Sequence, residues 1–307
     1  MIDVQHLTKR YGDVIAVDDV SFRVQPGRVT GFVGPNGAGK STTMRMILGL
    51  DRPTSGSVLI GGRPYRELEA PLRTIGALLD AAAVDAGRTA AHHLLWLAHS
   101  NHIAADRVTT VLELVGLDGV ADRRVGTFSL GMRQRLGIAA ALLGDPGVVM
   151  LDEPANGLDP DGILWLRAFT RQLADEGRTV FLSSHLMNEI SQTADHVVVI
   201  GRGRIIADSP MDSIIETHGI HTVHVRADRQ EDLIVHLVRH GADVTSADHG
   251  AIEVRGLSSA TVGSIALAEG IALTELTPHR PSLEDAFLEL THDLTLHAAS
   301  ASATKGD

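Results

Sequence analysis

The sequence predicts an α/β fold in which a parallel sheet carries helices on both faces. Three observations support this. Short apolar runs of β type alternate with longer helical patterns along the first two thirds of the chain, an order typical of a parallel sheet. A glycine-rich turn joins one run to a helix, and a pair of carboxylates ends another. In an open parallel sheet, both features fall at the edge where ligands bind.

The first expected strand of this sheet, Val29–Val33, leads through the glycine-rich turn into a helix from Lys40 to about Leu50. Between about Ala90 and Leu143 the pattern is mostly helical, which indicates an inserted helical subdomain. Three further strands are expected at Val148–Leu151, Thr179–Leu182 and Val197–Ile200. A helix is expected between the first two of these strands, at about Asp161–Glu176.

After about Gly219 the character changes to that of a small α/β unit, followed by an amphipathic helix in PSLEDAFLELT. That helix has Pro281 near its first turn and Ser282 as a possible N-cap. Strands of the small unit are expected at His221–Val225, Ile252–Val254 and Ile271–Leu276. We therefore expect a first domain over residues 1–218 with a helical insert at about 88–145, a C-terminal accessory domain over 219–296, and a disordered tail at 297–307.

Composition limits the classes of function. A chain of 307 residues can build a large core, and its net charge of −11 disfavours binding to a nucleic-acid backbone. The absence of cysteine excludes disulfides and thiolate metal sites. The N-terminus, MIDVQHLTKRYGD, lacks the apolar core of a signal peptide. No window approaches the roughly 18–20 apolar residues of a membrane span, so we expect any membrane contact to be made through another chain.

The glycine-rich turn GPNGAGKS fits the phosphate-binding pattern G-x-x-x-x-G-K-[ST] at Gly34, Gly39, Lys40 and Ser41. Glycines let successive backbone N–H groups curl around an anion, and the helix that follows adds its positive N-terminal end. Lys40 can reach outer phosphates and Ser41 can ligate Mg²⁺. An ordinary strand-to-helix turn is the alternative, but the strand before the turn and the helix after it favour a phosphate loop.

The carboxylate pair Asp152 and Glu153 ends the apolar run VVMLDEP. Asp152 can hold Mg²⁺, and Glu153 is placed to polarise a water against a γ-phosphate. A strand that simply reaches solvent would end in charges too. The phosphate-loop pattern earlier in the chain favours the catalytic interpretation.

The chain resembles the ATP-binding subunits of ABC transporters over roughly residues 1–215. The resemblance is carried by an ordered set of motifs: KRYG, GPNGAGKST, FSLGMRQRLGIA, VVMLDEP, NGLDP and LSSH. It implies an ABC-type P-loop ATPase domain with a parallel core sheet, an antiparallel β subdomain and a helical insert. The later pattern SLEDAFLELT, residues 282–291, is similar to that of bacterial drug, antibiotic or lipid exporters with a separate permease.

The resemblance also implies cofactors and site residues. It implies ATP and Mg²⁺, bound between two copies of the chain that close head to tail. His185 would bond the γ-phosphate and position water, and Asp159 would link the two sites. Among 16 histidines, only the LSSH context distinguishes His185 from a surface helix cap. The adenine of the nucleotide would contact Tyr11. Its γ-phosphate would contact Ser129 and Gly131 of the other copy. The nucleotide would also contact the loop residues Gly34, Pro35, Asn36, Gly37, Ala38, Gly39, Lys40, Ser41 and Thr42.

Two departures from the family pattern stand out. The signature is usually LSGGQ, whereas here Leu130 replaces a glycine and Met132 a glutamine. In IGALLDA the residue aligned with the family's usual glutamine is Asp80. Aspartate offers only charge when it is ionised, so we expect Asp80 to be a third Mg²⁺ ligand beside Ser41 and Asp152. The alternative is that Asp80 points away and the site is partly degenerate.

Three functions are compatible with these patterns. The first is the ATPase subunit of an exporter, forming a homodimer on the cytoplasmic face of the membrane with a separate transmembrane permease and no nucleic acid. The second is a soluble ABC-type regulator of ribosomes or nucleic acid, although such proteins usually carry two ATPase halves. The third is a nucleotide-gated sensor with weak turnover. The C-terminal region can either pack on the core or extend the dimer contact.

Overall fold

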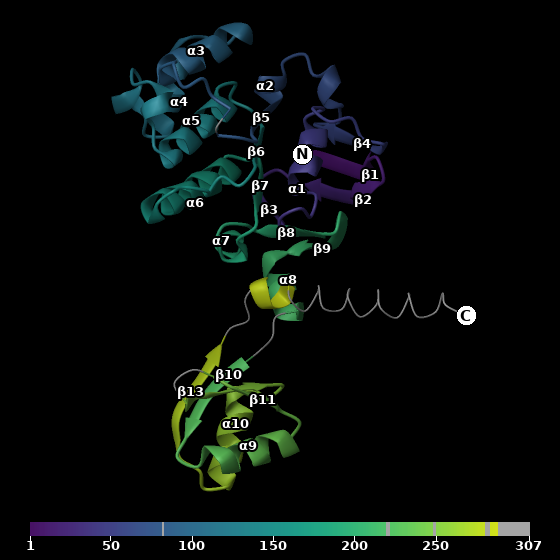
Figure 1. Ribbon diagram of the computed structural model, residues 1–307, viewed down its shortest axis with the longest axis vertical. Helices are drawn as coiled ribbons and strands as arrows, with labels where there is room; N and C mark the ends of the chain where they lie inside the picture. Colours follow the sequence, from purple (N-terminus) through teal and green to yellow (C-terminus); the bar gives the residue numbers. More distant parts are fainter. Residues whose placement is uncertain (82, 219–221, 248–249, 280–282, 288–307) are drawn as a thin grey trace, which may run out of the picture. The chain divides into compact units, whose positions relative to one another are not determined.

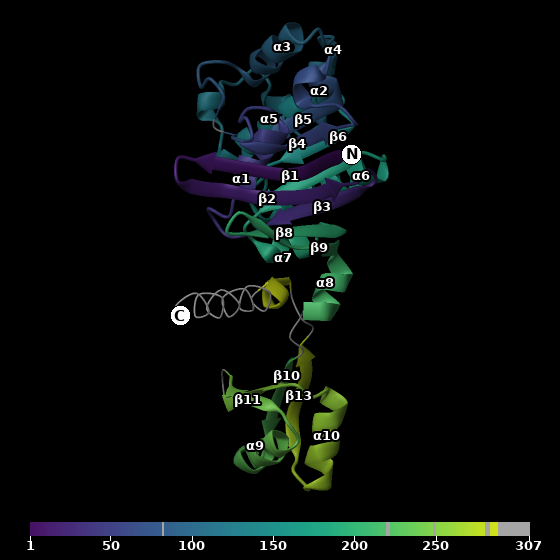
Figure 2. The same cartoon turned by 90° about the vertical axis from the view of Figure 1, so that its right-hand side faces the viewer.

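The computed structural model describes the chain except for residues 82, 219–221, 248–249, 280–282 and 288–307. The chain forms two compact units, Met1–Met211 and Asp212–Asp307, both visible in Figures 1 and 2. The division falls at the start of helix α8 (Met211–His218), whereas the sequence placed the boundary after residue 218. Strand β9 ends at Pro210 and runs directly into α8, so proline is the local sequence feature at this division.

The first unit is built on a six-stranded sheet with the order β5-β6-β7-β3-β8-β9. The first five strands are parallel, and β9 pairs antiparallel with β8. The prediction of a mostly parallel sheet is therefore confirmed. Strand β6 is buried at every position, as expected for a strand covered on both faces. The strands are β3 (Arg28–Val33), β5 (Ile75–Leu78), β6 (Val148–Leu151), β7 (Thr179–Ser184), β8 (His196–Gly201) and β9 (Arg204–Pro210).

Different layers cover the two faces of this sheet, as Figure 1 shows. Helices α5, α6 and α7 lie on one face, while α1 and a second, antiparallel sheet of order β2-β1-β4 lie on the other. Phe22 of the second sheet stacks on Phe32 and packs in a tilted arrangement against Phe181, both of the central sheet, and this joins the two sheets. The elements of this layer are β1 (Ile2–Tyr11), β2 (Val14–Val24), α1 (Lys40–Ile47) and β4 (Ser55–Ile60).

The expected helical insert is present, and it follows the short helix α2 (Pro71–Thr74) and strand β5. Two of its helices begin at side-chain N-caps, because Thr89 accepts from His92 N and Ser129 accepts from Met132 N. The main helices are α3 (Ala90–Ser100), α4 (Asp106–Leu114) and α5 (Leu130–Leu142), and the chain then continues through α6 (Pro160–Asp175) and α7 (Met187–Ser191). Across the described part of the chain, no helix is both long and apolar enough to cross a bilayer.

From β10 to β13 the second unit has the order β-α-β-β-α-β, with an antiparallel sheet arranged β11-β12-β10-β13. This is the ferredoxin-like arrangement. Its core is formed by the inner face of the sheet and by helices α9 and α10. The sequence missed β11, a mostly exposed edge strand of four residues. The elements are β10 (Thr222–Ala227), α9 (Gln230–Arg239), β11 (Asp243–Ser246), β12 (Ile252–Arg255), α10 (Ser259–Ala268) and β13 (Leu273–His279).

The predicted final helix is only partly described, since residues 283–287 are helical with Leu283 and Ala286 buried. The expected N-terminal residues of that helix, Pro281 and Ser282, lie outside the described residues. The tail at 297–307 also lies outside them.

Candidate nucleotide and catalytic site

The phosphate loop connects β3 to α1, and its glycines are required by close backbone contacts. Gly37 and Gly39 have φ of 80° and 109°, in the region that side chains disfavour. A Cβ at Gly39 would lie 2.7 Å from the carbonyl oxygen of Ala16, and one at Gly34 would lie 2.2 Å from that of Ile200. These contacts cannot be relieved by a side-chain rotation, because both oxygens belong to the backbone. The tip residues Pro35, Asn36 and Gly37 are exposed, while Ala38 and Gly39 are buried.

Lys40 is the first residue of α1, and it is almost completely buried, at 6% exposure. Its Nζ donates to the carbonyl oxygens of Gly34 at 2.6 Å and Pro35 at 3.5 Å, so the ammonium lies inside the curl of its own loop. It also lies 3.5 Å from Glu153 Oε1. Ser41 is exposed and Thr42 half-buried on the next two positions. The first N–H groups of α1 have no partner within the helix, which suits them to an anion.

The carboxylate pair lies where β6 ends, beside the ends of its neighbouring strands β5 and β7. Asp152 is buried, and its Oδ1 accepts a hydrogen bond from the Ser183 hydroxyl. The Asp152 N–H donates to Leu78 O at 2.7 Å, which ties the pair to the neighbouring strand β5. The oxygen donors Ser41, Asp152 and Asp80 are the ligand type that Mg²⁺ prefers, so this set of residues fits a magnesium site.

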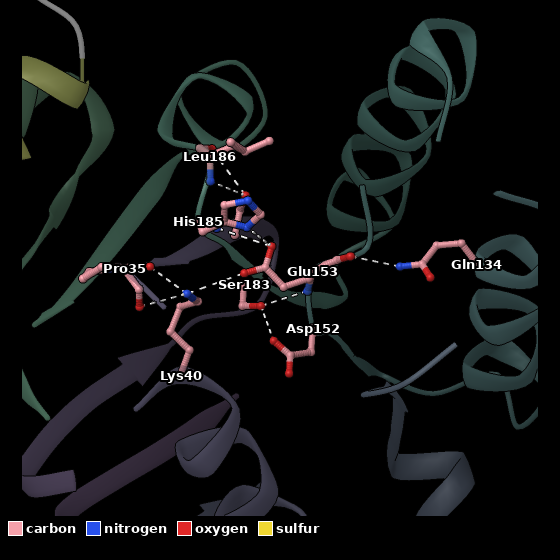
Figure 3. Close-up of polar contacts among 10 residues, drawn as sticks. Pro35, Lys40, Gln134, Asp152, Glu153, Ser183, His185 and Leu186 are labelled. Carbon is pink, nitrogen blue, oxygen red and sulfur yellow. Dashed lines mark hydrogen bonds and ion pairs between the residues drawn. The ribbon is translucent and has the colours of Figure 1, made fainter. Parts of the chain in front are cut away.

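Glu153 lies between two cationic or protonatable groups, as Figure 3 shows. Its Oε1 faces Lys40 Nζ, while its Oε2 lies 2.8 Å from His185 Nδ1 and 3.4 Å from the backbone nitrogen of His185. The structure therefore brings Lys40, Glu153 and His185, predicted from three separate motifs, into one contiguous group. The Glu153 side chain is 22% exposed, so a water molecule can reach it.

Tyr11 lies at the end of β1 with half of its surface exposed. Its hydroxyl donates to Asp51 Oδ2 at 3.2 Å, and Lys9 Nζ lies 4.8 Å from the centre of one ring face. Burial raises the pKa of Tyr11, and the hydrogen bond and charge of Asp51 raise it further, against smaller opposing effects of Arg45 and Thr42. A ring held in this way can offer its other face to a base.

The signature residues begin helix α5 at some distance along the chain from the phosphate loop. Ser129 is the exposed N-cap of this helix. A Cβ on Gly131 would lie 3.1 Å from Gly157 O, so this glycine permits close packing on the loop after β6. Leu130, which departs from the family pattern, packs its side chain against Gly157 and remains 49% exposed. These residues contact the loop after β6 within the same chain.

The two remaining predicted residues, Asp159 and Asp80, make hydrogen bonds with residues three positions further along the chain. Asp159 is the N-cap of α6, accepting from Gly162 N at 2.9 Å. Asp80 is exposed just beyond the end of β5, and its carbonyl accepts from Ala83 N at 3.3 Å.

Three residues of the site were not singled out from the sequence. Ser183 and Gln134 hold the backbone around Glu153, and Asp51 holds the Tyr11 hydroxyl. Ser183 stands inside LSSH and Gln134 inside FSLGMRQRLGIA, so both were within quoted motifs. Each makes its contact with a residue from another segment, which a linear pattern does not reveal.

A strand-to-helix phosphate loop beside an Asp-Glu pair and a histidine defines a P-loop ATPase. Comparison with known proteins gives its family. Residues 17–156 match the family model for ABC transporters, and residues 221–284 match a domain of unknown function, DUF8746. The chain is 37% identical to the bacitracin transport ATP-binding protein BcrA of Bacillus licheniformis, across 94% of this chain and 97% of that protein.

A second relative is the Nod factor export ATP-binding protein I of Cupriavidus metallidurans, 33% identical across 95% of this chain and 97% of that protein. Among solved structures, an ATP-binding subunit of an ABC transporter superposes with a TM-score of 0.64 at 27% identity, covering 70% of this chain and 92% of that one. This chain belongs to the ABC transporter family, and its first unit is the nucleotide-binding ATPase cassette of that family.

Proposed function

We propose that this chain hydrolyses ATP to drive the export of a drug, antibiotic or lipid-like compound through a separate membrane permease. The observation that carries the hydrolytic part is the Glu153 carboxylate, held between Lys40 and His185 at the carboxyl end of β6. The export part is supported by the two relatives, which are named for bacitracin transport and Nod factor export.

Glu153 acts as the general base in the proposed reaction. It accepts a proton from water as the water oxygen bonds to the γ-phosphorus, and the bond to the β-γ bridging oxygen breaks to leave ADP and phosphate. Lys40 balances negative charge on the outer phosphates, and His185 orients the carboxylate and the attacking water. Tyr11 stacks on the adenine, and the backbone of Gly34–Thr42 surrounds the phosphates.

Mg²⁺ would be held by Ser41, Asp152 and Asp80, and when bound it neutralises charge on the phosphate oxygens. Asp152 already directs Oδ1 to Ser183, so Oδ2 is the oxygen that it would offer to the cation. Ser183 thus fixes the orientation of a ligand as well as its position.

The proposed assembly is a homodimer on the cytoplasmic face of the membrane. Ser129 and Gly131 of one copy would contact the γ-phosphate held by the other, and the N-terminus of α5 would direct its dipole at that charge. Asp159 would link the two sites across the dimer. The permease supplies the membrane-spanning part.

The test compares Glu153→Gln with wild type and with Glu113→Gln, an exposed carboxylate on α4 that serves as the matched control. A general base contributes about 10²–10⁴ in rate, so Glu153→Gln should lose at least about 100-fold in turnover. Nucleotide affinity should persist, because Lys40 remains in the loop. Turnover within about threefold of wild type lies outside the range for a general base and would remove Glu153 from that role.

The same variant tests the partner. Tagged Glu153→Gln, trapped with Mg-ATP and purified from detergent-solubilised membranes, should bring a multi-span membrane protein with it. Ribosomes, or no membrane protein at all, would support the regulator or sensor instead and refute the export proposal.

A further inference from the structure

The backbone of Glu153 has a conformation that a residue with a side chain rarely adopts. Its φ is +49°, in the left-handed region, although glutamate has a Cβ that disfavours this region. Such a conformation persists only when surrounding contacts hold it. Because the direction of a side chain follows its backbone, this conformation determines whether the carboxylate faces Lys40 and His185.

Two buried side chains hold this backbone from opposite sides, as Figure 3 shows. Gln134 Nε2 donates to the carbonyl oxygen of Glu153 at 2.9 Å, and Ser183 Oγ accepts from the Glu153 N–H at 2.9 Å. Gln134 is only 4% exposed and Ser183 is fully buried. Water therefore competes poorly for either hydrogen bond. Loss of the Ser183 hydroxyl leaves the Glu153 N–H without its described acceptor, and loss of Gln134 leaves the carbonyl with the longer bond from Asn156 N at 3.2 Å.

The two holding residues come from different elements. Gln134 lies on α5, the helix that Ser129 caps, and Ser183 lies on β7, two residues before His185. Ser183 also donates to Asp152, so one hydroxyl fixes both members of the carboxylate pair. The carboxylate of Glu153 itself contacts neither Gln134 nor Ser183 among the described interactions.

We infer that Gln134 and Ser183 are positioning residues for ATP hydrolysis, which fix the Glu153 carboxylate through its main chain. Gln134 thereby connects the signature helix to the proposed base of the same chain. This inference rests on the proposed role of Glu153. It adds that turnover depends on a neutral, almost completely buried amide of the helical insert, which acts through the main chain of Glu153.

The principal variant is Gln134→Met in the full chain, because methionine keeps the length and volume of glutamine in a buried position and removes the donor. Gln172→Met on α6 is the control, since the exposed Gln172 also donates through its amide, in its described contact to the surface carboxylate of Glu176. Displacement of a catalytic group costs up to about 100-fold in rate, so we expect kcat to fall between about 5-fold and 100-fold. Affinity for a fluorescent ATP analogue should stay within about twofold of wild type, because binding does not use the Glu153 backbone.

A double-mutant cycle separates positioning from general damage. If Gln134 acts only through Glu153, Gln134→Met should have no further effect on the residual turnover of Glu153→Gln. Ser183→Ala should lower kcat as well, and it should also raise the Mg²⁺ concentration at half-maximal turnover, because it releases Asp152. Gln134→Met should leave that Mg²⁺ concentration unchanged.

The outcomes distinguish the two proposals. If Glu153→Gln lost turnover and Gln134→Met kept the wild-type kcat, the positioning role of Gln134 would be overturned, while Glu153 would remain the general base. Retained turnover in Glu153→Gln would overturn both. Parallel losses of kcat, nucleotide affinity and melting temperature in Gln134→Met, or full additivity in the cycle, would show that Gln134 merely supports the fold and would overturn the inference.

Discussion

The contact between Leu130 and Gly157 gives a prediction whose magnitude follows from the structure. Gly157 has a φ of +77°, and a Cβ there would lie 2.2 Å from Leu130 Cδ2 and 2.3 Å from its Cγ. Gly157→Ala therefore meets two costs. The left-handed backbone costs an alanine about 1–2 kcal/mol, and Leu130 must also leave its position.

The second cost follows from the exposure of Leu130. Full burial of a leucine side chain is worth about 1.5–3 kcal/mol, and Leu130 is 49% exposed, so its displacement costs about 1 kcal/mol. Gly157→Ala should therefore destabilise the first unit by about 2–3 kcal/mol in total. Gly177→Ala is the matched control, because Gly177 has a φ of +87° with nothing within 4 Å of a Cβ. Gly177→Ala should lose only the stability that the left-handed backbone costs an alanine, about 1–2 kcal/mol.

The assay is chemical denaturation followed by tryptophan fluorescence. The chain has two tryptophans, Trp96 and Trp165, and both lie in the first unit, so the signal reports the unfolding of that unit alone. In the Gly157→Ala background, Leu130→Ala should cost about 1 kcal/mol less than it does in wild type, because the contact is already lost. Equal losses for Gly157→Ala and Gly177→Ala, or strict additivity with Leu130→Ala, would refute the reasoning.

Two further predictions concern carboxylates near the site. Asp80→Gln should make turnover depend less steeply on the Mg²⁺ concentration, because an ionised aspartate repels the γ-phosphate unless Mg²⁺ is present. Titration of both forms with Mg²⁺ checks this, and identical dependence would contradict it. Burial raises the pKa of Glu189 against smaller opposing effects of Arg167 and His185. The folded state therefore binds this proton more tightly than the unfolded state, and wild-type stability falls as the pH rises through the folded pKa. Glu189→Gln should be more stable than wild type at neutral pH, and this difference in stability should disappear below about pH 4.5. Thermal melting of both proteins from pH 4 to 7 measures the difference. A gap that does not change with pH would contradict the argument, and Glu113→Gln on the exposed face of α4 is the control.

The sequence predicted those parts of the molecule in which pattern and burial coincide. Strand β6 was assigned with its observed bounds because all four of its residues are apolar and buried. The phosphate loop was recognisable because its glycines, Lys40 and Ser41 form one contiguous pattern between a strand and a helix. The backbone oxygens that exclude a Cβ at Gly34 and Gly39 belong to Ile200 and Ala16 on other strands, and the pattern alone does not reveal them. In the second unit, β11 was missed because an edge strand buries little, so its residues follow no apolar alternation.

Contacts between segments were beyond the reach of the sequence. Nothing in VVMLDEP shows that Glu153 has a left-handed backbone, since glutamate is not a residue that favours it. Asp51 follows the helix of the phosphate loop as an ordinary charged residue, and only the fold brings it to the Tyr11 hydroxyl. The motif residues could therefore be named from the sequence, while the residues that hold them in place could not.

The start of helix α5 has two contacts with one short segment of the same chain. Leu130 packs on Gly157, and Gln134, about one helical turn further on, donates to the Glu153 carbonyl. The segment from Glu153 to Gly157 is thus held at both ends by a helix of the insert. Its central part forms a tight turn, with Asn156 N bonded to Glu153 O at 3.2 Å. A shift of α5 along or across the sheet would move both contacts and with them the Glu153 carboxylate. We therefore expect a perturbation of the helical insert to change the rate of hydrolysis through this chain's own α5, in addition to any effect of Ser129 and Gly131 on the partner copy.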